Sequence, residues 1–198
     1  GKDYFKAIVK STGMTNPIID ANIKASMDLQ KMNRAFGIPN FDVRGILNAD
    51  IVANGEYNKV QKKYPITNGT VELKNGHLKT EYYPNPIEKI NLIAKVNNTK
   101  GTAKDMDIDI KQASFLFEGK PLSMKARFQN LEDIAYDIKA KGELDVAKVY
   151  KVFSQRGLDL DGFVKMDVAF QGKQSDATNG NYAKLKNSGI LELRNIKV

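Results

Sequence analysis

Few side chains in this sequence are placed to do chemistry. His77 is the only histidine and there is no cysteine, so the chain has neither a thiolate nucleophile nor a Cys- or two-His metal site. We interpret His77 as an exposed residue of a hairpin whose turn is Asn75-Gly76, because Asn-Gly is a strong two-residue turn signal.

Two acidic stretches resemble sites more closely. In KDMDIDIK (104–111), Asp105, Asp107 and Asp109 alternate along one face of a predicted strand. Neighbouring carboxylates can act as general acid and base, but charges alternating with apolar residues are also typical of a solvated strand face, which we favour. LDLDG (158–162) lacks the first acidic ligand and the closing Glu of a calcium loop. We therefore expect no catalytic residue, metal site or cofactor, and a hydrolase is the least supported function.

The charge and the types of basic residue in the chain indicate which classes of partner it could bind. The net charge is +8, from 31 Lys and Arg against 23 Asp and Glu side chains. Only five of the basic residues are Arg, and Trp is absent. Sequence-specific nucleic-acid recognition relies on Arg and on aromatic stacking, so we expect no nucleic-acid partner. The scattered lysines fit a solvated face, or weak attraction to anionic lipid headgroups or lipopolysaccharide phosphates.

Alternation of apolar and polar residues dominates the chain and predicts strands. Clear examples run over 47–53, 90–96, 106–110, 122–128, 134–140 and 164–170. Turn residues at 119–121 and 130–133 separate consecutive strands by short links, which indicates an antiparallel meander.

Two segments have helical rather than strand spacing, and they belong to a repeat. Residues 28–37 and 145–157 each begin at an aspartate, Asp28 and Asp145, that suits an N-cap. At an offset of 117, residues 20–55 align with 137–172 without a gap, and nine of these 36 positions are identical. GTVELKN from Gly69 then returns as GILELRN from Gly189, at an offset of 120.

The predicted fold is mainly β: a curved antiparallel meander sheet with two short helices. A strand–helix–strand unit is repeated in residues 20–78 and 137–198, on either side of a plainer meander at 79–136. We expect residues 1–198 to form a single domain and to be a fragment of a longer protein.

The apolar face of such a sheet needs a cover. Each fully buried aliphatic or aromatic side chain contributes roughly 1.5–3 kcal/mol, and two short helices cannot roof eight or so strands. One possibility is that the sheet curls onto itself as a sandwich or barrel, because most apolar stripes belong to a core. The other is that its concave face stays open and binds an apolar partner.

Several stretches resemble the C-terminal periplasmic region of AsmA-like proteins, in the versions found in Bacteroidetes-type bacteria. They are ITNGTVELKNGHLKTEYYPNPIEKINLIAKVNN, KDMDIDIKQASFLFEGKPLSMKARFQN, YDIKAKGELDVAKV, LDGFVKMDVAFQGKQSDA and NSGILELRNIKV. The resemblance implies a periplasmic location, an inner-membrane anchor outside this sequence, and a role in outer-membrane biogenesis. It also implies kinship with TamB and with bridge-like lipid carriers, whose curved sheets shield acyl chains.

The leading hypothesis is therefore a periplasmic segment that contacts phospholipid or lipopolysaccharide acyl chains through an apolar β-groove and contributes to envelope lipid transport. The alternative is a non-catalytic structural or interaction module with a closed core, which pairs with adjacent segments or with an outer-membrane assembly partner. The residues expected to line the groove are Leu47, Ile51, Leu92, Ile108, Met124, Phe128, Ile138, Met166, Val168 and Phe170.

Overall fold

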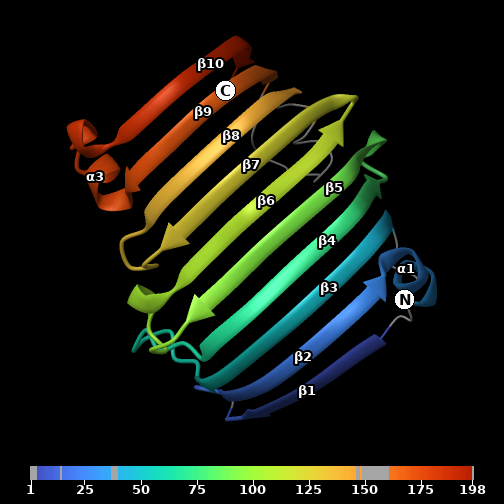
Figure 1. The fold of residues 1–198 in the computed structure, drawn as a ribbon, viewed down its shortest axis with the longest axis vertical. Helices are drawn as coiled ribbons and strands as arrows, with labels where there is room; N and C mark the ends of the chain where they lie inside the picture. Colours follow the sequence, from blue (N-terminus) through green and yellow to red (C-terminus); the bar gives the residue numbers. More distant parts are fainter. Residues whose placement is uncertain (1–3, 14, 37–39, 146–147, 149–160, 198) are drawn as a thin grey trace.

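The chain folds into one open, curved antiparallel sheet of ten strands in sequence order (Figure 1). The computed structural model describes residues 4–13, 15–36, 40–145, 148 and 161–197. Every strand pairs with its neighbours in the chain, and β1 does not pair with β10. The mainly-β meander predicted from sequence is confirmed, and within the described residues the sheet closes into neither a barrel nor a sandwich.

The strands are long, and the helices are short. In chain order the elements are β1 (Tyr4–Thr12), β2 (Ile18–Asp28), α1 (Leu29–Phe36), β3 (Phe41–Glu56), β4 (Ile66–Thr80), β5 (Tyr83–Asn98), the 3₁₀ turn η1 (Ala103–Asp105), β6 (Asp107–Phe117), β7 (Lys120–Gln129), β8 (Ala135–Asp145), β9 (Asp161–Lys173), α3 (Gln174–Thr178), the 3₁₀ turn η2 (Tyr182–Lys184) and β10 (Lys186–Lys197). None of the helices in the described ranges is long and apolar enough to cross a membrane.

The first predicted helix is confirmed as α1, which packs against β3 and β2. Asp28 caps it, since its Oδ1 accepts a hydrogen bond from the backbone N–H of Gln30 at 2.9 Å. The second predicted helix lies outside the described residues apart from Asp145 and Lys148. These two repeat the capping contact, because the N–H of Lys148 donates to Asp145 Oδ1 at 3.1 Å.

The predicted hairpin at Asn75-Gly76 is wrong. β4 continues through both residues, and the register of β4 against β5 shifts there, between Leu73 and Gly76. Asn75 does have the positive φ, 49°, that favours Asn, but the chain uses it for a β-bulge rather than a turn. A Cβ on Gly76 would lie 2.9 Å from Ile90 Cβ, so glycine is needed for close packing. β4 turns into β5 further on, at residues 81–82.

The three aspartates of 105–109 are also not one row on a strand. Asp105 ends η1, and only Asp107 and Asp109 belong to β6. The sequence did not reveal this difference, because aspartates and apolar residues alternate through η1 as they do in β6, although the backbone of η1 turns.

The internal repeat is visible in the structure at the level of individual ladder pairs. β2 and β8 correspond residue for residue at an offset of 117, and β10 begins 120 residues after β4. Ile51 pairs with Gly69, and their counterparts Val168 and Gly189 also pair. Gly45 and Gly162 have φ values of 123° and 126° at matching positions.

Over the part of the chain that the structure describes, the buried core is small. Its main cluster lies at one end of β5 and β6, where Tyr83, Ile87 and Phe117 are each at most 9% exposed. Among the described residues, most other buried apolar positions are alanines. Outside this cluster, most large strand side chains are partly exposed and shelter smaller neighbours, as in a single-layer sheet.

Candidate functional site

The ten predicted groove residues lie on one face of the sheet, here called the apolar face. Directly paired residues in neighbouring strands point to the same side. Leu47, Leu92, Met124 and Val168 belong to one continuous row of pairs across β3 to β9, through Leu73, Ala113 and Ala140. A second row contains Ile51, Ile108 and Phe128, and a third contains Ile138 and Phe170. Met166 pairs with Gly142, two residues along the strand from Val168.

Side chains on the apolar face pack against their neighbours in the same sheet rather than against a second layer. A Cβ on Gly69 would lie 3.0 Å from Ile51 Cγ1 and 3.2 Å from Val96 Cγ1, so these two side chains lean over the glycine from both sides. Ala126 is only 4% exposed between large neighbours. Small residues on this face are therefore sheltered by the larger apolar side chains beside them.

Few described elements stand over this face. Ten strands at about 4.8 Å spacing span roughly 45 Å, whereas an eight-residue helix such as α1 is only about 12 Å long. Figure 1 shows α1 at the end of β2 and β3 and α3 at the opposite edge, beside β9. The middle of the sheet in the described part therefore forms a single layer.

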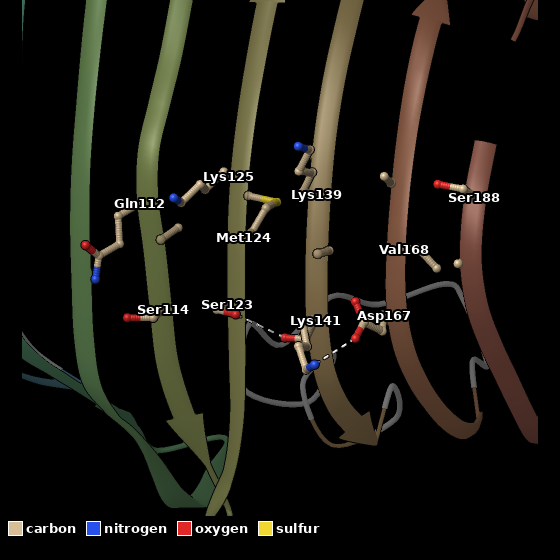
Figure 2. Close-up of a pocket in the computed structure, with 14 residues that line it drawn as sticks. Gln112, Ser114, Ser123, Met124, Lys125, Lys139, Lys141, Asp167, Val168 and Ser188 are labelled. Carbon is tan, nitrogen blue, oxygen red and sulfur yellow. Dashed lines mark hydrogen bonds and ion pairs between the residues drawn. The ribbon is translucent and has the colours of Figure 1, made fainter. Parts of the chain in front are cut away.

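Several hollows lined by described residues lie on the other side of the sheet, the polar face. One of them has a volume of about 580 Å³ and crosses β6 to β10 (Figure 2). Its walls include Lys125, Lys139, Lys141 and Asp167, whose side chains alternate with the apolar row. The apolar-face residues two positions away from this row, such as Ala126 and Ile138, do not line the hollow, which places it on the polar face. A second hollow, of about 530 Å³, continues it along β7 to β10.

We expected a groove on the apolar face, but these hollows lie on the polar face. Of the ten predicted residues, Met124 and Val168 border the first hollow and Met166 the second. The physical reason lies in side-chain shape. Apolar side chains lean on one another and fill the pleats, whereas charged side chains extend into solvent and leave space between their rows.

The polar hollow carries excess positive charge. Lys125 and Lys139 are directly opposite each other in the β7–β8 ladder. Lys141 Nζ lies 2.7 Å from Asp167 Oδ2, and this hydrogen bond raises the pKa of Lys141. Over the residues that the structure describes, Lys125 and Lys139 have no ion-pair partner. Sequence alternation placed these lysines on the polar face, but only the register shows which of them face each other.

A second polar cluster fixes one end of the sheet and was not predicted. Glu118, in the turn between β6 and β7, accepts hydrogen bonds from the Tyr83 hydroxyl and from Asn85 Nδ2, the latter at 2.9 Å. Its other oxygen lies 2.6 Å from Lys148 Nζ. The Lys148 ammonium and the Tyr83 hydroxyl lower the pKa of Glu118 to about 2. The partners are 30 to 35 residues away in sequence, so no local pattern indicates the cluster.

The residues that could have done acid–base chemistry are dispersed. Asp105 accepts hydrogen bonds from the Thr99 hydroxyl and the Lys100 N–H, which lower its pKa. The Arg127 guanidinium lowers the pKa of Asp107, and Lys111 pairs with Asp109. Each carboxylate therefore has its own partner, and the three do not converge on a common site.

His77 is not the exposed turn residue that we expected. Its side chain is 22% exposed within β4, and its Nε2 lies 3.9 Å from Asp42 Oδ2. Arg44 holds the same carboxylate and lowers the pKa of Asp42. Across the described residues, no group of three or more His, Cys, Asp or Glu side chains could hold a metal ion.

Comparison of the chain with protein-family models, with characterised proteins and with solved structures gives no match.

Proposed function

We propose that the apolar face binds the acyl chains of phospholipid or lipopolysaccharide, and that the chain is a periplasmic AsmA-like segment that contributes to envelope lipid transport and outer-membrane biogenesis. The observation that carries the proposal is the open single-layer sheet, whose apolar face has no second layer over its middle in the described part. An apolar surface of this extent is stabilised when hydrocarbon replaces water against it.

The mechanism is passive. Acyl chains lie across the rows of Leu, Ile, Met and Phe side chains, and sliding along such a uniform surface breaks no specific contact. Cationic side chains at the ends and edges of the sheet attract anionic headgroups, each by about 1 kcal/mol near a charged lipid surface. The parent protein would be anchored in the inner membrane through a segment outside this sequence, as the resemblance to AsmA-like proteins implies.

The alternative role, a non-catalytic module with a closed core, has less support. The described sheet is open, and its edges β1 and β10 are not paired with each other. A role in protein interaction would depend on these edges rather than on a closed core.

Lipid extraction and mass spectrometry on gently purified protein provide the first test. We expect co-purifying phospholipid or lipopolysaccharide, and binding of a fluorescent fatty acid by the delipidated chain. Absence of both from a folded protein contradicts the proposal.

Neighbouring residues on opposite faces give a matched pair of variants. Leu92 and Ile138 lie on the apolar face, whereas Ile93 and Val52 lie on the polar face and are 37% and 45% exposed. Threonine keeps strand propensity while removing apolar contact. Leu92→Thr with Ile138→Thr should weaken fatty-acid binding about thirtyfold, since roughly 1 kcal/mol is lost at each site. Ile93→Thr with Val52→Thr should leave binding unchanged, and equal losses in both pairs would contradict a binding site on the apolar face.

A further inference from the structure

The two edge strands expose large apolar side chains. On the apolar face Phe5 and Val9 of β1 are 63% and 58% exposed, and Leu191 and Leu193 of β10 are 51% and 57% exposed. β10 contains no proline and is not covered by any described element. An unpaired apolar edge of this kind is a template for another strand.

The internal repeat indicates which strand fits the edge of β10. β10 corresponds to β4, and the β9–β10 ladder reproduces the register of the β3–β4 ladder. In the first copy, the other edge of β4 is occupied by β5. The outer edge of β10 is therefore equivalent to the edge at which β5 pairs with β4.

The exposure of matched side chains supports this equivalence. Val71 and Leu73 of β4 are half-buried, with Ala94 and Leu92 of β5 directly opposite them. Their counterparts in β10, Leu191 and Leu193, are more than half exposed. The same apolar residue types are thus present at the same positions, and the difference is the missing neighbour.

We propose that the outer edge of β10 docks an antiparallel strand with the side-chain pattern of β5, in the register of the β4–β5 ladder. In this register Val96 of the docked strand faces Gly189, Ala94 faces Leu191 and Leu92 faces Leu193. The glycine matters because Val96 leans over Gly69 in the first copy, with its Cγ1 3.2 Å from the position of a Cβ there. Docking would lengthen the apolar face by about 4.8 Å per strand, and it does not depend on lipid binding.

A second copy of this chain does not provide that strand at its β1 edge. β1 corresponds to β7 and not to β5, because Thr12 pairs with Ile18 as Gln129 pairs with Ala135, at the same offset of 117. A β7-type strand belongs next to a β6-type strand. The β1 edge of another copy therefore has the wrong pattern for β10.

For the test, a second copy of residues 79–117, which contain β5 and β6, is added to the end of the full chain. It is joined directly after Val198, because Val198 aligns with Leu78 at the offset of 120. Backbone hydrogen exchange of β10 is then measured by NMR. The β10 amides equivalent to those that bond β4 to β5 should exchange about tenfold more slowly, or slower still, than in the unextended chain.

The matched control carries Leu92→Pro and Ala94→Pro within the added segment only, and it should leave β10 exchange unchanged. A synthetic peptide of residues 83–98, added in trans to the full chain, gives a second measurement if the extended chain folds poorly. Unchanged β10 exchange with both the extension and the peptide would overturn the proposal. Protection of β10 in the unextended chain that grows with protein concentration would also overturn it, because a second copy would then occupy the edge.

Discussion

Individual residues tie this single-layer sheet together where it has little core. Glu118 joins Tyr83 and Asn85 of β5 to Lys148, which follows β8. Its side chain is 22% exposed, so solvent screens these contacts only in part. Contacts of this kind replace the second layer of side chains that a sandwich or barrel would supply.

The pKa of Glu118 gives a prediction about stability. Since the folded-state pKa is about 2, below the usual 4.5, the contribution of Glu118 is complete above pH 4.5 and is lost as the pH falls toward 2. Glu118→Gln should therefore lower the free energy of unfolding by about 1–2 kcal/mol at pH 7, after discounting for screening, and by almost nothing near pH 2. Urea unfolding of both proteins from pH 2 to 7 measures the difference.

The control for this prediction is Glu88→Gln, at an exposed carboxylate of β5. It should change stability little at any pH. A Glu118→Gln effect that is the same at pH 2 and pH 7 would mean that the charge of Glu118 does not stabilise the fold.

Gly45 provides a prediction about backbone geometry. Its φ is 123°, and a Cβ there would lie 2.8 Å from Gly76 Cα and 2.9 Å from the Lys74 carbonyl oxygen. Gly119 also has a positive φ, 75°, but a Cβ there would meet nothing within 4 Å. Thermal or urea unfolding should show a loss of about 2–4 kcal/mol for Gly45→Ala and about 1 kcal/mol for Gly119→Ala. Equal losses would mean that the close approach of β3 and β4 is not important.

At the scale of the elements, local signals predicted much of the fold. Alternation identified the strands, and Asp28 identified the start of α1 because capping is a local interaction. The Asn75-Gly76 pair misled the prediction, since a positive φ serves a bulge as well as a turn. The Glu118 cluster and the facing pair Lys125 and Lys139 depend on which strands are neighbours and in what register, and one sequence does not state that.

The shared caps of the repeat give a prediction at this scale. Asp28→Ala and Asp145→Ala should each destabilise the protein by about 1 kcal/mol, because each removes a carboxylate that accepts a hydrogen bond from a backbone N–H. Asp20→Ala is the control, since Asp20 is an exposed strand residue that aligns with Asp137. Chemical denaturation measures all three, and a loss at Asp20 as large as at the caps would contradict the capping role.

At the scale of the whole molecule, the residues that the structure describes form one layer with two unlike faces. The apolar face is filled sideways by interlocking side chains, and the polar face holds hollows bordered by lysines. The sequence predicted the surplus of apolar strand surface. It left open whether the sheet would close on itself, because closure depends on curvature and on the pairing of the two edges.

The most direct measurement uses the absence of cysteine in the chain. Leu92→Cys and Ile93→Cys place a small environment-sensitive fluorophore on the apolar and polar faces of the same strand. When a fatty acid is added to the delipidated protein, the label at residue 92 should shift to shorter wavelength and the label at residue 93 should not. No shift at either residue, or a shift at residue 93 alone, would contradict an apolar face that binds acyl chains.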